Sequence, residues 1–259
     1  MAVCTVLLGV AAYFFFSGPA ATGSLLKGKR IFLAGDSRSS TDYTFYEEIL
    51  ERKTGGDALV EGASGCTAAY NASDEYFVRV ADNRHDFSLW LVGGNDPGEA
   101  GTIGTFSDSS PLAEQGEAVV TETDLSEDYH GETFIQAVDH MMRKYRALYS
   151  GKKEPVMIFC TDLPQQRDDP DSPWSRQENW ERKRLAILEC CEKNGVECLD
   201  LYTLCGFDMS REPMFHAPTD TVHDNGIYTM DGLHPNPRGI EKITDLEIEA
   251  MERLLKTAS

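Results

Sequence analysis

Basic side chains are scarce in this sequence. Its 259 residues include 24 Lys and Arg but 43 Asp and Glu, which gives a formal net charge of −19. A chain this acidic is repelled by nucleic-acid phosphates and by anionic lipid surfaces. We therefore expect neither a nucleic-acid partner nor binding to an anionic membrane surface. Nothing in the sequence indicates a protein partner or sets the oligomeric state.

Metal-binding patterns are also missing. The seven cysteines include no Cys-x-x-Cys pair of the kind that a structural zinc site requires. Four of them lie between residues 190 and 205, in a mainly apolar stretch that is typical of small buried side chains. The sequence does not decide whether Cys198 and Cys205 form a disulfide. The sequence therefore predicts no metal and no organic cofactor.

Long apolar runs are absent except at the N-terminus. Residues 3–16 are apolar and small residues follow them, as in the hydrophobic and cleavage regions of a secretory signal. The run is shorter than the roughly 20 residues of a membrane span, and the first basic residues come only after it. We interpret residues 1–24 as a signal peptide or anchor, which favours a secreted or membrane-anchored protein over a cytoplasmic one. A helix packed on the domain and a false upstream start are the alternatives.

The chain from residue 30 onwards alternates short apolar runs with longer amphipathic stretches. Within each short run the residues are apolar without alternating with polar ones, as in strands that helices cover on both faces. The predicted strands are 31–34, 58–61, 87–92, 156–160 and 196–201. The predicted helices are 43–52, 74–81, 132–149, 174–194 (ended by Gly195 as C-cap) and 237–256. This alternation predicts a flavodoxin-like three-layer α/β/α sandwich with a five-stranded parallel sheet, formed by one domain over residues 25–259.

Two long connections interrupt this pattern, at residues 97–131 and 202–236. Long connections in compact domains are usually functional, and both leave from the carboxyl ends of predicted strands, where ligands bind in open parallel sheets. The first is acidic, but its carboxylate spacing matches no EF-hand loop. We interpret it as a solvated insertion, with a lid beside the site as the alternative.

Four short motifs follow strand ends or precede the last helix. They are Gly35-Asp36-Ser37, Gly62-Ala63-Ser64-Gly65, Gly93-Gly94-Asn95-Asp96 and Asp231-Gly232-Leu233-His234. Each is weak evidence alone, because a Gly-Asp-Ser turn is common in loops. Because the carboxyl ends of parallel strands share one edge of the sheet, the four motifs are expected to converge on one crevice.

The four motifs resemble, in order, the sequence blocks of the SGNH or GDSL-type serine hydrolases, over roughly residue 29 to the C-terminus. The resemblance implies that Ser37 is the nucleophile, His234 the base and Asp231 the acid that orients it. It also implies an oxyanion hole formed by the backbone N–H groups of Ser37 and Gly65 and by the side-chain amide of Asn95.

These roles agree with the chemistry of the residues. A serine hydroxyl becomes a good nucleophile only when an imidazole removes its proton, and the imidazole needs a carboxylate on its other nitrogen. Glycine at 65 is expected to let the backbone approach the substrate closely, and Asp96 is interpreted as an anchor of its loop. A second Asp-x-x-His, Asp220 to His223, is the alternative location of the acid and base.

Two positions depart from the family pattern. Arg38 follows the serine where an aliphatic residue is common, so either the acyl pocket differs or the arginine binds a substrate anion. Glu61 stands where asparagine is frequent, which leaves open how the second-block loop is supported. The remaining histidines are interpreted as structural or exposed (His85, His130 and His140) or as solvated loop residues (His216, and His223 if it is not the base). A place at the substrate mouth is the alternative for His216 and His223.

The site predicts a serine esterase that works through an acyl-enzyme intermediate. By analogy with the family, the substrate is expected to be a small acyl group such as acetyl on a carbohydrate. Two alternatives are retained. One is a lysophospholipase or thioesterase-type acyl hydrolase. The other is a non-catalytic carbohydrate-binding module on the same fold.

Overall fold

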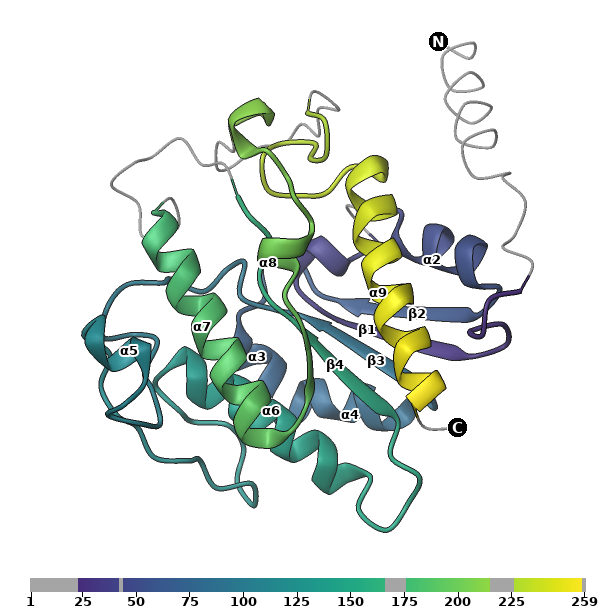
Figure 1. The fold of residues 1–259 in the computed structure, drawn as a ribbon. Helices are drawn as coiled ribbons and strands as arrows, with labels where there is room; N and C mark the ends of the chain where they lie inside the picture. Colours follow the sequence, from purple (N-terminus) through teal and green to yellow (C-terminus); the bar gives the residue numbers. More distant parts are fainter. Residues whose placement is uncertain (1–22, 42–43, 166–175, 215–225, 258–259) are drawn as a thin grey trace.

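The structure is a computed structural model that describes residues 23–41, 44–165, 176–214 and 226–257 (Figure 1). The predicted signal or anchor, residues 1–24, lies almost wholly outside these ranges. Within them, no helix combines the length and the hydropathy of a membrane span.

A five-stranded sheet forms the centre of the molecule. Its strands are β1 (Arg30–Gly35), β2 (Asp57–Gly62), β3 (Phe87–Leu91), β4 (Val156–Cys160) and β5 (Glu197–Leu199). All neighbours pair in parallel, in the order β2-β1-β3-β4-β5. This order is the flavodoxin-like one, so the predicted fold class is confirmed. Strand β5 is shorter than predicted because Leu201 already begins a helix, α8 (Leu201–Leu204).

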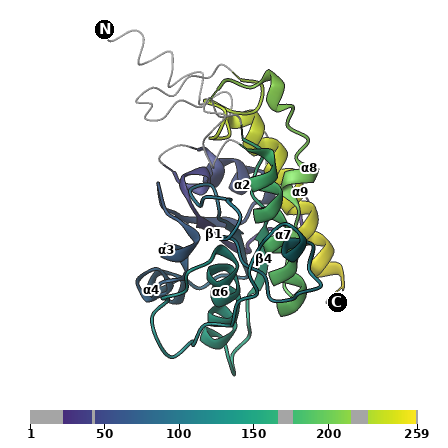
Figure 2. The ribbon, with the colours of Figure 1, turned by 90° about the vertical axis from the view of Figure 1, so that its left-hand side faces the viewer.

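Helices cover both faces of the sheet, which explains why the strands are mainly apolar. One face carries α3 (Ala68–Ala72), α4 (Asp74–Asp82), α6 (Phe134–Leu148) and α7 (Gln177–Asn194). The opposite face carries α2 (Tyr46–Thr54), α8 and α9 (Pro237–Thr257). Figure 2 shows α3, α4 and α6 on one side of the strands and α9 on the other. The first core centres on Trp90 of β3, whose ring stacks on Phe77 and Phe159.

The helix ends follow signals that the sequence contains. Helix α6 begins with a capping box, in which the Thr133 hydroxyl accepts from the N–H of Gln136 while the Gln136 side chain accepts from the N–H of Thr133. Helix α7 ends at Gly195, whose φ of +58° gives it the left-handed conformation expected of a C-cap. Helices α3, α8 and α5 (Pro111–Glu114) were not predicted, because four or five residues are too few to show a helical period.

The acidic insertion is attached to the helices beside it. Its own Glu117 is buried and accepts from the backbone N–H groups of Gly101, Ile103 and Gly104. Glu189 of α7 accepts from the N–H of Phe106 at 2.9 Å. Further along, Glu122 pairs with Lys193 of α7 at 2.5 Å and lies 3.9 Å from Arg143 of α6. The positive charge that the insertion lacks is therefore supplied by α6 and α7.

Candidate active site

The turn after β1 places Ser37 at the carboxyl edge of the sheet. Gly35 ends the strand with a φ of +147°, and a Cβ at this position would run into the carbonyl oxygen of Leu91 on β3. Only glycine therefore fits. Asp36 then caps a single 3₁₀ turn, Ser37–Ser39, by accepting from the N–H of Arg38 at 3.1 Å. Ser37 begins this turn and is 5% exposed.

Ser37, His234 and Asp231 form one continuous hydrogen-bonded chain. The Ser37 Oγ atom lies 2.9 Å from His234 Nε2, and His234 Nδ1 lies 2.6 Å from Asp231 Oδ2. Residues 37 and 234 are 197 positions apart in sequence, and all three side chains are at least nine-tenths buried. The structure therefore brings together the three residues that the sequence motifs nominated for the nucleophile, base and acid.

The Asp231–His234 turn is held by its own carboxylate. Asp231 Oδ1 accepts from the backbone N–H groups of Leu233 and His234 at 3.0 and 2.8 Å. Burial alone would raise the pKa of Asp231, but the hydrogen bonds and the charge interaction with His234 outweigh it and lower the pKa. Asp231 is therefore ionised at neutral pH, and an ionised carboxylate fixes the imidazole with its Nδ1 protonated.

A buried glutamate supports this turn from outside. Glu212 accepts from the N–H and the hydroxyl of Thr229, at 2.9 and 2.8 Å, and that hydroxyl in turn accepts from the N–H of Gly232 at 3.0 Å. Glu212 was not predicted as part of the site, because a carboxylate in a long acidic loop gives no signal of its own.

The three groups that the resemblance nominated for the oxyanion hole are the N–H groups of Ser37 and Gly65 and the Asn95 amide. Within the part of the chain that the structure describes, the backbone N–H groups of Ser37 and Gly65 have no hydrogen-bond acceptor. Asn95 Nδ2 donates one hydrogen bond, to the carbonyl of Cys66 at 3.0 Å, and an amide nitrogen carries a second N–H. The reason for glycine at 65 is backbone conformation: its φ is +74°, whereas a Cβ there would meet no protein atom within 4 Å.

Asp96 anchors the loop that carries Asn95. Its carboxylate accepts from the N–H of Ala68, the first residue of α3, at 2.9 and 3.1 Å. Asp96 is 8% exposed, and burial raises its pKa to about 6. The contact agrees with the interpretation of Asp96 as an anchor, because it ties the third motif to the loop of the second.

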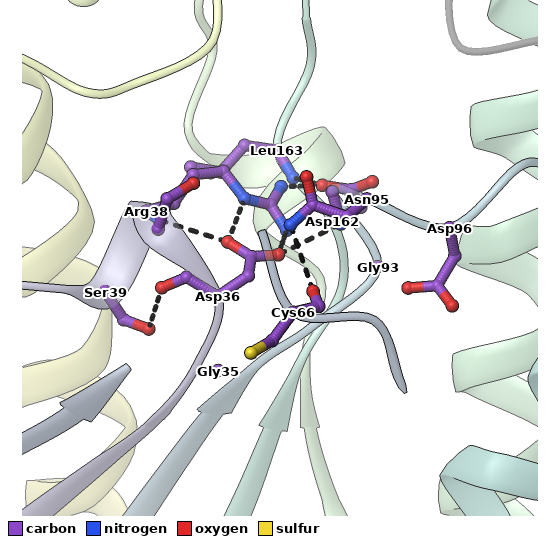
Figure 3. A network of polar contacts seen from close by, with 12 residues as sticks. Gly35, Asp36, Arg38, Ser39, Cys66, Gly93, Asn95, Asp96, Asp162 and Leu163 are labelled. Atoms are coloured by element: carbon purple, nitrogen blue, oxygen red, sulfur yellow. Dashed lines mark hydrogen bonds and ion pairs between the residues drawn. The ribbon is translucent and has the colours of Figure 1, made fainter. Parts of the chain in front are cut away.

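Arg38 is fully buried between two carboxylates. Its guanidinium binds Asp36 through Nε at 2.9 Å and Nη2 at 2.6 Å, and binds Asp162 through Nη1. Figure 3 shows the guanidinium between these two residues, while Asp96 points away from it. Both carboxylates belong to the protein and the side chain is fully buried, so the structure contradicts one of the two alternatives for Arg38, the binding of a substrate anion.

Two members of this buried cluster were missed by the sequence reasoning. Asp162 lies two residues after β4 ends, the same kind of position as Ser37 and Asn95, so the strand-end rule would have found it. Lys183 of α7 donates to Asp162 at 2.8 Å and to the Gly93 carbonyl at 2.6 Å. Nothing in the sequence distinguishes Lys183 from the exposed charges of the same helix.

Glu61, the other departure from the family pattern, contacts helix α4 through both its backbone and its side chain. Its backbone carbonyl accepts from the hydroxyl of Tyr76 at 3.0 Å, and the same hydroxyl accepts from the N–H of Gly35 at 3.3 Å. Its carboxylate lies 3.9 Å from Arg79. Tyr76 of α4 thus joins the ends of β1 and β2.

The remaining histidines lie in different parts of the chain. His85 contacts the Tyr145 hydroxyl through Nε2 at 2.7 Å, and His140 is buried with Nδ1 2.6 Å from the Thr123 hydroxyl. His216 and the alternative pair Asp220 and His223 fall outside the described residues.

The described residues contain no group of three or more His, Cys, Asp or Glu side chains arranged to hold a metal ion. Cys198 and Cys205, whose pairing the sequence left open, are free thiols.

The contacts among Ser37, His234 and Asp231 at the carboxyl edge of the sheet have the geometry of a Ser-His-Asp triad, a constellation that recurs on several unrelated folds. The sequence model of the GDSL-like lipase/acylhydrolase family matches residues 32–242. The chain belongs to this family of ester hydrolases, as its four motifs predicted. No curated protein sequence matches it significantly.

Solved structures share the fold at low sequence identity. A protein from Lactobacillus plantarum is 20% identical with a TM-score of 0.58, and the match covers 88% of this chain and 98% of that one. A possible lipase from Chitinophaga pinensis is 15% identical with a TM-score of 0.61, covering 87% and 98%. A lipase/acylhydrolase from Enterococcus faecalis is 16% identical with a TM-score of 0.52, covering 86% and 95%.

Proposed function

We propose that this protein is a carboxylic-ester hydrolase in which Ser37 attacks the substrate carbonyl and forms an acyl-enzyme. The observation that carries the proposal is the chain of contacts from Ser37 Oγ through His234 to Asp231, at 2.9 and 2.6 Å. In the first half-reaction His234 takes the Ser37 proton and passes it to the leaving alcohol. In the second, His234 takes a proton from water, whose oxygen attacks the acyl carbon, and returns that proton to Ser37 Oγ as the acid leaves.

The negative charge that develops on the carbonyl oxygen needs aimed donors. We assign this role to the N–H groups of Ser37 and Gly65 and to the second N–H of Asn95. Removing one such donor typically costs about 10²- to 10³-fold in kcat. The absence of competing acceptors for the two backbone N–H groups in the described structure supports the assignment.

For the substrate, we propose a small acyl group such as acetyl, carried by a neutral alcohol such as a carbohydrate. The net charge of −19 supports a neutral substrate over a polyanionic one. A lysophospholipid or thioester substrate is the alternative within the enzymes. A non-catalytic carbohydrate-binding module is disfavoured because all three triad side chains are present and in hydrogen-bond contact.

The test is hydrolysis of p-nitrophenyl acetate by the wild type and by Ser37→Ala. Loss of the nucleophile is expected to lower kcat by roughly 10⁶-fold, and unchanged activity in the variant would reject Ser37. The wild type is then compared on acetylated sugars, longer-chain p-nitrophenyl esters, a lysophospholipid and an acyl thioester. We expect the highest kcat/KM on the acetylated sugars, and a preference for the lysophospholipid or the thioester would establish the alternative.

A further inference from the structure

The charged cluster behind Ser37 forms a closed ring that includes the loop of Asn95. Asp36, Arg38, Asp162 and Lys183 come from the β1 turn, the end of β4 and helix α7, and none of them is more than 1% exposed. Arg38 joins the two carboxylates, and Lys183 joins Asp162 to the Gly93 carbonyl. The N–H of Gly94 closes the ring by donating to Asp36 Oδ2 at 3.0 Å.

The ring leaves little freedom to the segment that it encloses. The Gly93 carbonyl and the Gly94 N–H are both bound to it, and Asn95 follows directly. A Cβ at Gly94 would lie 2.8 Å from the Arg38 guanidinium, so the backbone packs directly against the arginine. Asp36 also immediately precedes Ser37, so a single carboxylate binds the turn of the nucleophile and the loop of the oxyanion amide.

The charges in the ring balance. Two carboxylates face two cations, and a buried charge is tolerated only when it is paired and hydrogen-bonded. Burial by itself would raise the pKa of Asp36, but Arg38 and the N–H of Gly94 outweigh it and lower the pKa. Asp36 therefore stays ionised, and a hydrogen bond from Gly94 to an ionised carboxylate is stronger than one to a neutral acid.

We propose that Arg38, Asp162 and Lys183 are positioning residues that fix the Gly93–Asn95 segment, and with it the Asn95 amide, relative to Ser37. The inference rests on the proposed function, because positioning matters only if Asn95 stabilises an oxyanion. On this inference Arg38, which departs from the family pattern, has a positioning role. The Asn95 amide stabilises an oxyanion most when it is already in place and does not move during the reaction.

The decisive variant is the charge-balanced pair Arg38→Leu/Asp162→Asn, which removes one cation and one carboxylate. Its kcat on p-nitrophenyl acetate is expected to fall by about 10- to 10²-fold with KM nearly unchanged. Arg38→Lys retains the charge but not the planar fork that reaches both carboxylates. It is expected to fold and still lose about tenfold in kcat, so it decides the question if the double variant does not fold.

Two controls separate positioning from general stability. The first control, Arg143→Gln/Asp139→Asn, removes a different ion pair with a buried carboxylate. In this pair, on α6, Arg143 Nε lies 2.6 Å from Asp139 Oδ2. This control variant is expected to lower the urea midpoint but not kcat. In an Asn95→Ala background, the Arg38→Leu/Asp162→Asn pair is expected to cost much less than it does in the wild type, because both changes remove the same donor.

A wild-type kcat in Arg38→Leu/Asp162→Asn, or an equal loss with and without Asn95, would overturn this inference while leaving the esterase intact. An equal loss of kcat in the Arg143→Gln/Asp139→Asn control would overturn it too, because the effect would then be one of general stability. If Ser37→Ala keeps wild-type activity, the proposed function fails and this inference fails with it.

Discussion

Glu247 makes the stability of this protein depend on pH in a way that one substitution removes. It lies on α9, is 1% exposed, and accepts a hydrogen bond from the Tyr46 hydroxyl of α2. Its second oxygen, Oε2, is buried without a hydrogen-bond partner. Burial raises its pKa from an ordinary 4.5 to about 8, although Tyr46 and Lys53 act in the opposite direction. The carboxyl is therefore protonated in the folded protein at neutral pH.

The sign of the effect follows from proton binding. Between pH 4.5 and about 8 the folded state holds a proton on Glu247 that the unfolded state has released. The free energy of unfolding therefore falls as pH rises, by on the order of 1 kcal/mol for each pH unit. The stabilisation is complete at acid pH, declines through this window and is gone above the folded pKa. Over the whole window the loss amounts to a few kcal/mol.

Glu247→Gln retains an oxygen for the Tyr46 hydroxyl and cannot ionise. Urea unfolding of both proteins at pH 5, 6, 7 and 8 isolates the contribution of Glu247, because every other titrating group is shared. We expect the variant to gain stability relative to the wild type at each step towards pH 8. A difference between the two proteins that does not change with pH would refute the reasoning.

Four further changes test other parts of the structure. Asp231→Asn removes the charge that fixes the imidazole, and it should lower kcat on p-nitrophenyl acetate by about 10⁴-fold; a loss below tenfold would contradict its role. His234→Ala should abolish turnover while His223→Ala retains most of it, and the reverse result would move the base to the second Asp-x-x-His. Gly94→Ala forces a Cβ to within 2.8 Å of the Arg38 guanidinium, so both kcat and the melting temperature should fall; wild-type values of both would show that the segment has room. Thr133→Ala removes the capping box of α6 and should cost about 1 kcal/mol in urea unfolding at unchanged kcat.

The sheet and the strand-end motifs could be predicted because they depend on local pattern. Continuous apolar runs specify buried parallel strands, and parallel topology then brings their carboxyl ends together. Ser37 and Asn95 could be placed in one crevice on this basis alone. The strand ends differ from the predicted ones by at most two residues, and the largest difference is at β5, where Asp200 is already the N-cap of α8.

The charged ring could not be predicted, because its contacts join distant parts of the chain. Lys183 and Asp162 are 21 residues apart, and Arg38 and Asp162 are 124 apart. A lysine on a helix is normally solvated, and only the packing of α7 on the sheet buries this one. The same holds for Glu212, whose role depends on the path of a long loop.

The most direct test of the account is to identify the residue that a fluorophosphonate modifies. The reagent reacts with a serine only where a base and an oxyanion site activate it. Digestion and mass spectrometry of the treated wild type should find one adduct, on Ser37, and Ser37→Ala and His234→Ala should remain unmodified. An adduct on another serine, or hydrolysis that continues in a protein fully modified at Ser37, would contradict the assignment of the nucleophile.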